Sequence, residues 1–199
     1  MIVVDVETTG LVPHRHGIIS LGAVNFKHPE HYFYAIGKPH PSVEVNNRAL
    51  EVNGITREEL QAYPDTAGDI VNQFIAWVNT QDPDTSRLMA GHNVGFDYFF
   101  LLAEMDRWGI PRNNFPFKHR TIDLHTAAQT DYVQKKGFTY FNDMPADFIQ
   151  KKLGLPVEPT PHHALNGAIF ESECFSRLWF GKHMFEDFKD IPIKANPWT

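Results

Sequence analysis

The stretch Val3-Val4-Asp5-Val6-Glu7-Thr8-Thr9-Gly10 decides how the rest of the sequence is interpreted. An apolar run that carries two acids and stops at Thr-Thr-Gly predicts a buried strand with carboxylates at its end. Asp5 and Glu7 are two residues apart, so both side chains point to one face of that strand. Close carboxylates repel each other and resist burial, which favours a hard divalent cation between them, Mg²⁺ or Mn²⁺. The octapeptide alone also permits an edge strand with two solvated acids.

Composition narrows the class of protein. The 199 residues are 42% hydrophobic and 21% charged, which suits one folded domain. The formal charge of −6 argues against a sequence-independent duplex binder, but it allows a protein that holds one end of a nucleic acid through metal ions. The single cysteine, the lack of a bilayer-length apolar run and the lack of a signal-like pattern lead us to expect a cytoplasmic protein without membrane contact.

The order of the expected elements predicts an α/β fold with a mixed central sheet flanked by helices. Strands are expected over 2–8, 18–26 and 31–37, as an antiparallel meander, and over 88–91. Helices are expected over 48–54, from Thr56 with Glu59 as its capping box, and over 65–79, 96–108, 146–153 and 164–180. Residues 130–143 show no clear period, so we expect a loop or a short irregular helix there.

Two further stretches carry candidate site residues. The second stretch is His92-Asn93-Val94-Gly95-Phe96-Asp97, in which the side-chain amide of Asn93 can hydrogen-bond to the backbone of the turn. Asp97 falls in the first turn of a helix, where the helix dipole favours a carboxylate even without any catalytic role. The aromatics that follow, at positions 96, 99 and 100, have helical spacing and are expected in the core. In His162-His163-Ala164, a histidine before a helix is free to act as a general base, although loop histidines are usually only solvated.

Together the three stretches resemble the DnaQ-like exonucleases of the RNase H-like fold, in the subgroup whose motifs spell D-E-D-D with a histidine. The matching segments are Asp5–Leu11, Ala49–Thr56, His92–Asp97 and His162–Ala168, in the family's order and spacing. The resemblance delimits an exonuclease domain at residues 1–182. The closely spaced Pro192, Pro197 and Trp198 predict that residues 183–199 form a C-terminal surface tail.

The resemblance implies a two-metal 3′-to-5′ exonuclease that releases nucleoside 5′-monophosphates from DNA or RNA. Asp5 would bridge both Mg²⁺ or Mn²⁺ ions, Glu7 would bind one of them, and Asp97 would hold the cluster through water. His162 would take the proton from the attacking water, whose pKa a bound metal lowers.

The same resemblance assigns substrate contacts. Thr8 and Thr9 would lie against the 3′ hydroxyl, with Asn93 also near the substrate, and Leu11 would wedge beside the terminal base. A buried turn residue is the alternative for Leu11. We expect the 3′ end to be single-stranded or short, because the negative charge disfavours a long basic groove. A polymerase partner or a homo-oligomer cannot be inferred from the sequence.

One position departs from the family pattern. The fourth acid should lie five residues after the histidine, which is Gly167 when counted from His162 and Ala168 when counted from His163. We expect the loss to weaken one metal site and to slow the reaction. A nucleic-acid-end-binding or proofreading-type scaffold protein that has lost turnover is the alternative function, and a residue changed deliberately to trap a substrate is a further possibility.

Glu171 offers a replacement for the missing acid. It lies four residues beyond Gly167, about 6 Å along the same helix face, on an otherwise apolar stripe. Helical side chains tilt toward the N-terminus, so Glu171 leans back toward the gap. We expect it to supply part of the missing metal ligation, directly or through water. The alternative places Glu171 at the edge of the stripe, reaching solvent.

Overall fold

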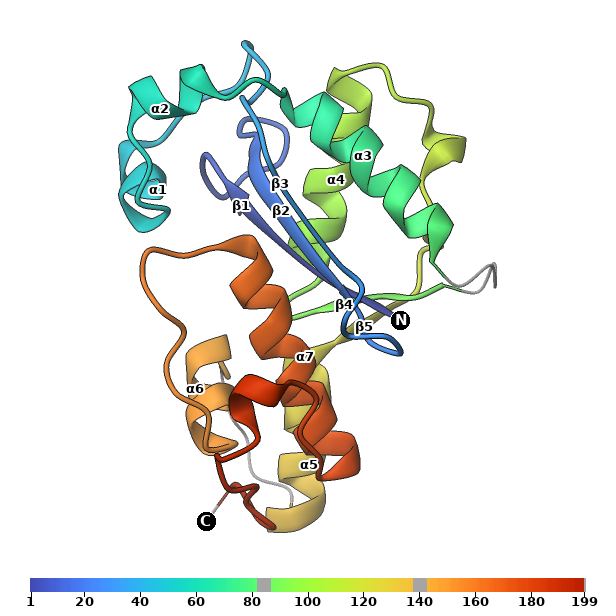
Figure 1. The fold of residues 1–199 in the computed structure, drawn as a ribbon, viewed down its shortest axis with the longest axis vertical. Coiled ribbons are helices and arrows are strands. Elements are labelled where there is room, and N and C mark those ends of the chain that lie inside the picture. The colour runs from blue at the N-terminus through green and yellow to red at the C-terminus, as the bar shows by residue number, and fades with distance from the viewer. Residues whose placement is uncertain (82–86, 138–142, 199) are drawn as a thin grey trace.

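The computed structural model describes residues 1–81, 87–137 and 143–198, and Figure 1 shows a central sheet between two layers of helices. The strand order is β3-β2-β1-β4-β5. The strands are β1 (Ile2–Thr8), β2 (Ile18–Asn25), β3 (Tyr32–Ile36), β4 (Met89–Gly91) and β5 (Thr121–Asp123). β1, β2 and β3 form the predicted antiparallel meander, and β4 and β5 run parallel to β1. β1 is therefore the central strand, and the edge-strand alternative for Asp5 and Glu7 is wrong.

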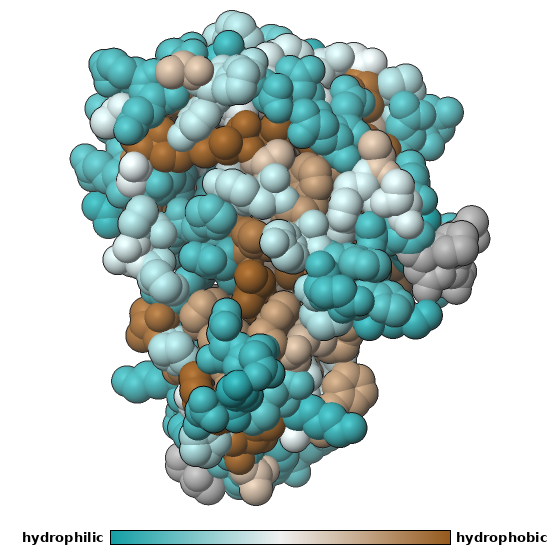
Figure 2. Space-filling view, viewed as in Figure 1, coloured by the Kyte–Doolittle hydropathy of each residue, from teal (hydrophilic) through white to brown (hydrophobic). Residues whose placement is uncertain are grey.

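Seven α-helices surround this sheet in the described part of the chain. They are α1 (Asn47–Val52), α2 (Arg57–Ala62), α3 (Ala67–Thr80), α4 (Gly95–Arg107), α5 (Leu124–Lys136), α6 (Ala146–Lys152) and α7 (Ala164–Phe180). Helices α3 and α4 pack on one face, and α5, α6 and α7 pack on the other (Figure 1). Figure 2 shows hydrophilic side chains over most of the face in view, with hydrophobic ones in a band and a smaller central group.

The two faces of β1 carry different side chains. Val4 and Val6 belong to the core between the sheet and α3 and α4, whereas Val3 belongs to the core under α5 and α7. Side chains alternate along a strand, so Asp5 and Glu7 point to the same face as Val3. The sheet thereby directs both acids toward α7.

Local signals explain most of the helix ends. Thr56 and Glu59 form the predicted capping box of α2, and Gly181 in the left-handed conformation ends α7. The prediction of an irregular segment from residue 130 is wrong as far as Lys136, because α5 extends to that residue. Asp123, which accepts a hydrogen bond from the backbone N–H of Thr126 at 3.1 Å, caps this weakly amphipathic helix. Residues 138–142 lie outside the described residues.

The segment from residue 183 to 198, expected as a surface tail, packs two aromatic side chains into the core. Phe188 and Trp198 are buried beside α5 and α7. The fully buried Arg177 pairs with Glu173 at 2.8 Å. It also donates to the carbonyl oxygens of Leu153, Phe188, Ile191 and Pro192, which ties this segment to α7. Across the described ranges, no helix combines the length and the hydrophobicity that crossing a bilayer requires.

Helix α7 approaches the sheet most closely at Gly22 of β2. A Cβ atom at this position would overlap the backbone of Ala164, the first residue of α7. Gly22 is paired with Asp5 in the β1–β2 ladder. The absence of a side chain at position 22 therefore lets the start of α7 lie directly beside Asp5.

We predict that Gly22→Ala lowers the free energy of unfolding by about 2–3 kcal/mol, because backbone atoms have to move to accept the methyl group. Urea unfolding followed by circular dichroism measures the loss. Gly95→Ala is the matched control, since no atom lies within 4 Å of a Cβ there, and it should leave stability unchanged or slightly raised. Equal stability of the two variants would contradict the close packing of α7 on β2.

Candidate active site

Asp5 and Glu7 lie partly buried near the end of β1, on the side of α7. Burial, followed by the negative charge of Glu158, raises the pKa of Asp5 to about 7. Burial, followed by the charges of Asp5 and Glu158, raises the pKa of Glu7 to about 9. The structure thus brings the two acids together where their charged forms are disfavoured without a cation.

Asp97 joins these acids from the first turn of α4. Its side chain is buried, and its Oδ1 atom accepts a hydrogen bond from the backbone N–H of Val6 at 2.9 Å. That bond places the carboxyl beside the β1 backbone at Val6, the residue between Asp5 and Glu7 in the chain. Burial raises the pKa of Asp97 well above its usual value, and the charge of Asp5 raises it further. Asp97 is therefore more than a residue that favours the start of a helix.

Gly167 lies in the first turn of α7, directly over Asp5. A Cβ atom at position 167 would overlap the Oδ2 atom of Asp5. The helix thus presents to Asp5 the position where the resemblance expects a carboxylate, and the glycine leaves that space to the Asp5 side chain.

Glu171 is one turn further along α7 and is only 6% exposed. Burial raises its pKa well above the usual value, and the charges of Asp5 and then Asp97 raise it further. Its Oε2 atom is buried without a hydrogen-bond partner among the described residues. The alternative in which Glu171 reaches solvent is wrong. We call Asp5, Glu7, Asp97 and Glu171 the acid cluster.

A fifth acid, which the sequence did not predict, lies near this cluster. Glu158 lies in the segment between α6 and α7, and its charge raises the pKa values of Asp5 and Glu7 and, more weakly, that of Glu171. Burial raises the pKa of Glu158 itself to about 7. The sequence around it carries no motif or period that could have pointed to the site.

The two histidines before α7 have different surroundings. The His162 side chain is exposed and forms no hydrogen bond with a described residue, while its backbone N–H donates to the carbonyl oxygen of Val52 at 3.1 Å. The His163 ring stacks on Tyr34 with centroids 4.1 Å apart, and burial lowers its pKa. The loop is thus held at both residues, and only His162 keeps a free imidazole.

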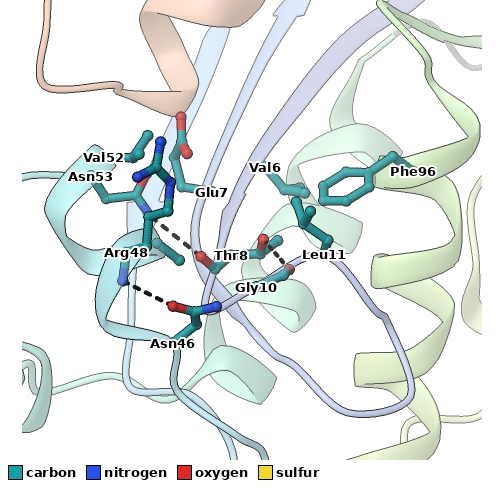
Figure 3. A pocket seen from close by; sticks show the side chains of 11 residues that line it. Val6, Glu7, Thr8, Gly10, Leu11, Asn46, Arg48, Val52, Asn53 and Phe96 are labelled. Atoms are coloured by element: carbon teal, nitrogen blue, oxygen red, sulfur yellow. Dashed lines mark hydrogen bonds between the residues drawn. The ribbon is translucent and has the colours of Figure 1, made fainter.

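A cavity of about 280 Å³ adjoins Glu7. Figure 3 shows Val52 at the end of α1 and the following Asn53 on one side, Leu11 and Phe96 on the other, and Thr8 between them. Leu11 is 80% exposed, so the buried-turn alternative for Leu11 is wrong. Phe96 lines the cavity and Phe99 is exposed, so of the three aromatics expected in the core only Phe100 is fully buried.

The other expected substrate contacts are placed differently. Thr9 is fully buried, donates to the carbonyl oxygen of Glu44 at 2.6 Å and accepts from the N–H of Gly17, so it supports the β1–β2 loop instead of lining the cavity. Asn93 is exposed in the left-handed conformation, with φ of 53°. Its side chain caps no helix; Asp123 instead accepts from the N–H of Val94 at 3.0 Å.

The acid cluster supplies the donors that a hard divalent cation prefers, namely carboxylate oxygens. None of the described lysine or arginine side chains forms an ion pair with it. As they stand, no three Asp, Glu, His or Cys side chains within the described ranges are grouped tightly enough to hold a metal ion. The donor chemistry and the unpartnered oxygen of Glu171 fit a cation, although the carboxyls would have to close in around it.

Comparison with known families matches residues 2–168 to the exonuclease family. The chain belongs to this exonuclease family. The resemblance inferred from the motifs is thereby confirmed.

Two curated relatives of this exonuclease chain illustrate the match. The PolC-type DNA polymerase III of Bacillus subtilis is 35% identical over 183 residues, which cover 89% of this chain and 11% of the polymerase. Ribonuclease T of Haemophilus influenzae is 28% identical over 127 residues, which cover 58% of this chain and 56% of the relative. The exonuclease chain thus spans about an eighth of the PolC-type relatives it matches.

Solved structures of low sequence identity share the exonuclease fold. Cell-death related nuclease 4 superposes with a TM-score of 0.68 at 15% identity, covering 89% of this chain and 62% of that one. Exonuclease I of E. coli in complex with a dT13 oligonucleotide gives 0.67 at 14% identity, covering 88% and 40%. The nuclease domain of 3′hExo, described as a DEDDh family member bound to rAMP, gives 0.62 at 18% identity, covering 98% and 96%. The predicted RNase H-like fold class is confirmed.

The raised pKa values predict how stability depends on pH in the presence of EDTA. An acid whose pKa is higher in the folded state holds a proton that the unfolded chain releases, so its stabilising contribution is lost as pH rises. The window runs from 3.8 to about 7 for Asp5 and from 4.5 to about 9 for Glu7. We expect the free energy of unfolding to fall by more than about 1 kcal/mol between about pH 5.5 and about pH 8.5.

Urea unfolding at several pH values measures this dependence. Asp5→Asn should flatten the fall, because it removes one of the titrating groups. Mg²⁺ or Mn²⁺ should also flatten it, because a cation favours the charged carboxylates. A free energy of unfolding that stays constant or rises over this range would contradict the burial of the acid cluster.

Proposed function

We propose that this exonuclease-family chain hydrolyses nucleic acids from the 3′ end and releases nucleoside 5′-monophosphates. The observation that carries the proposal is the position of Asp5, Glu7 and Asp97 at the end of the central strand, beside a cavity open to Glu7. The family match supports hydrolysis of a phosphodiester bond, and the geometry supplies the acids that such a reaction needs.

Asp5, Glu7 and Asp97 would hold Mg²⁺ or Mn²⁺ in this proposal. When bound, such ions stabilise the developing charge of an in-line displacement and make water more acidic. The side chains of the chain itself fix where this happens. The hydrogen bond from Val6 holds Asp97, and the pleat of β1 directs Asp5 and Glu7 to one side.

The cavity beside Glu7 would receive the terminal nucleotide. Leu11 and Phe96 provide apolar surface against which a base can stack or wedge, and Arg48 offers a positive charge for a phosphate. The Oδ1 atom of Asn53 is buried without a partner, although its amide group donates to the carbonyl oxygen of Thr8 at 3.3 Å. This unpaired acceptor oxygen of Asn53 could accept a hydrogen bond from a sugar hydroxyl group of the terminal nucleotide.

His162 is the proposed general base. Its backbone is fixed by Val52, and its neighbour His163 is fixed by the stack on Tyr34, while the His162 imidazole remains exposed. Because its backbone is anchored and its imidazole is free, His162 can turn toward the attacking water and accept its proton.

Single-stranded 3′ ends are the proposed substrate. The formal charge of −6 disfavours a surface that binds long duplexes, whereas the cavity suits one terminal nucleotide at a time. The solved structure of E. coli exonuclease I holds a dT13 oligonucleotide, and that of the 3′hExo nuclease domain holds rAMP. Both kinds of ligand support the proposal.

Gly167 favours a second candidate function, a protein that binds nucleic-acid ends without turnover. The position faces Asp5 and offers no carboxylate. A 5′-labelled single-stranded oligonucleotide incubated with Mn²⁺ separates the two functions. A ladder that shortens one nucleotide at a time supports the exonuclease, and binding without any product supports the end-binding protein.

We predict that His162→Ala lowers kcat by about 10²–10⁴-fold, which is the usual contribution of a general base. Mn²⁺ binding should stay unchanged, because the acid cluster remains intact. His163→Ala is the matched control and should lower kcat less, since it removes only the stack on Tyr34. A larger loss of kcat in His163→Ala than in His162→Ala would show that His162 is not the general base.

A further inference from the structure

We infer that Glu171 takes the place of the carboxylate missing at position 167 and is a ligand of the divalent cation held by Asp5 and Asp97. This inference rests on the proposed function, because it concerns the same metal site. It assigns the ligand to a different turn of α7 from the one that the family motif uses.

The first observation is the unpartnered oxygen of Glu171. Its Oε2 atom is buried and has no hydrogen-bond partner among the described residues, and it lies 3.4 Å from the place that a Cβ on Gly91 would occupy. The charges that reach Glu171 most strongly are those of Asp5 and Asp97, both negative. A buried carboxylate oxygen without a donor, in a side chain close enough to Asp5 and Asp97 for their charges to raise its pKa, fits a cation ligand.

The second observation comes from other buried glutamates in the same chain. Glu104 is fully buried, and its carboxylate accepts from Arg107 at 2.9 Å and from two N–H groups. Glu173 is also fully buried, and its carboxylate accepts from Arg177 at 2.8 Å and from the N–H groups that begin the following segment. These structural glutamates each have a cation and N–H donors, whereas Glu171 has only the backbone N–H of His92 as a donor and no ion pair within the described ranges.

The geometry of α7 explains how a carboxylate at position 171 can take the place of one at position 167. Residues 167 and 171 lie on the same helix face, separated by about 6 Å along the axis. The glutamate side chain is longer than an aspartate, and helical side chains tilt toward the N-terminus. Gly167, whose nearest neighbouring atoms are those of the Asp5 side chain, lies in that direction.

Glu171→Gln tests the inference because glutamine keeps the size and loses the charge. Titration calorimetry with Mn²⁺ on the full chain should show at least a tenfold loss of affinity for one ion. Stabilisation by Mn²⁺ in a thermal melt should shrink accordingly. Glu58→Gln on the exposed face of α2 is the control and should bind Mn²⁺ as the parent does.

A melt in EDTA supplies a second measurement that does not depend on metal. Without Mn²⁺, Glu171→Gln should melt no lower than the parent, because it removes a buried carboxyl whose charged form is disfavoured by the charges of Asp5 and Asp97. A variant that melts lower in EDTA and binds Mn²⁺ normally would overturn the inference and make Glu171 a structural residue.

The outcomes separate this inference from the proposed function. A parent chain that binds Mn²⁺ through Glu171 but cleaves no oligonucleotide would refute the exonuclease and leave the ligand assignment standing. Unchanged Mn²⁺ stoichiometry and affinity in Glu171→Gln, with cleavage by the parent, would overturn the ligand assignment alone.

Discussion

The repulsion among several carboxyl groups near the end of one central strand is the constraint that the surrounding structure has to meet. Asp5 and Glu7 share a face of β1, and Asp97 reaches the same place from α4. Charged forms of such groups repel one another where water is scarce, which is why burial and neighbouring acids raise their pKa values. The surrounding structure must therefore supply enough packing and hydrogen bonding to hold an arrangement that is unfavourable by itself.

Two local features provide that support. Strand β4 pairs with β1 only at its beginning, so the N–H of Val6 is available to donate to Asp97. On the other side, Gly22 lets α7 lie close enough to bring position 167 over Asp5. Both features involve the backbone of the sheet, so the position of the acids follows from strand pairing and helix packing more than from the acids themselves.

Much of this arrangement could be predicted from the sequence, but not all of it. The meander and the pairing of Asp5 with Glu7 follow from alternation along the strands, and Glu171 follows from the helical period. The bond between Val6 and Asp97 joins residues 91 positions apart, so no local pattern reveals it. β5 has only three residues, which is too short to give a clear strand pattern in the sequence. The weak amphipathicity of α5 gives no clear helical period, so that helix was not predicted. Glu158, far from Asp5 and Glu7 in the sequence, comes near them only in the folded chain.

Gly167 shows that the fold constrains the acids on the strand more tightly than the acid on the helix. The sheet fixes Asp5 and Glu7, because moving either by one residue would turn it to the opposite face. Helix α7 restricts the position of an acid less, because residues one turn apart share a face of the helix and differ mainly in how far their side chains must extend to the site. A glutamate at position 171 brings more rotatable bonds than an aspartate at 167, so holding it in one geometry costs more conformational entropy. Its burial beneath α7 limits that cost by restricting the side chain before any cation arrives. An acid from the helix can therefore move along the chain while the pair on the strand stays in place.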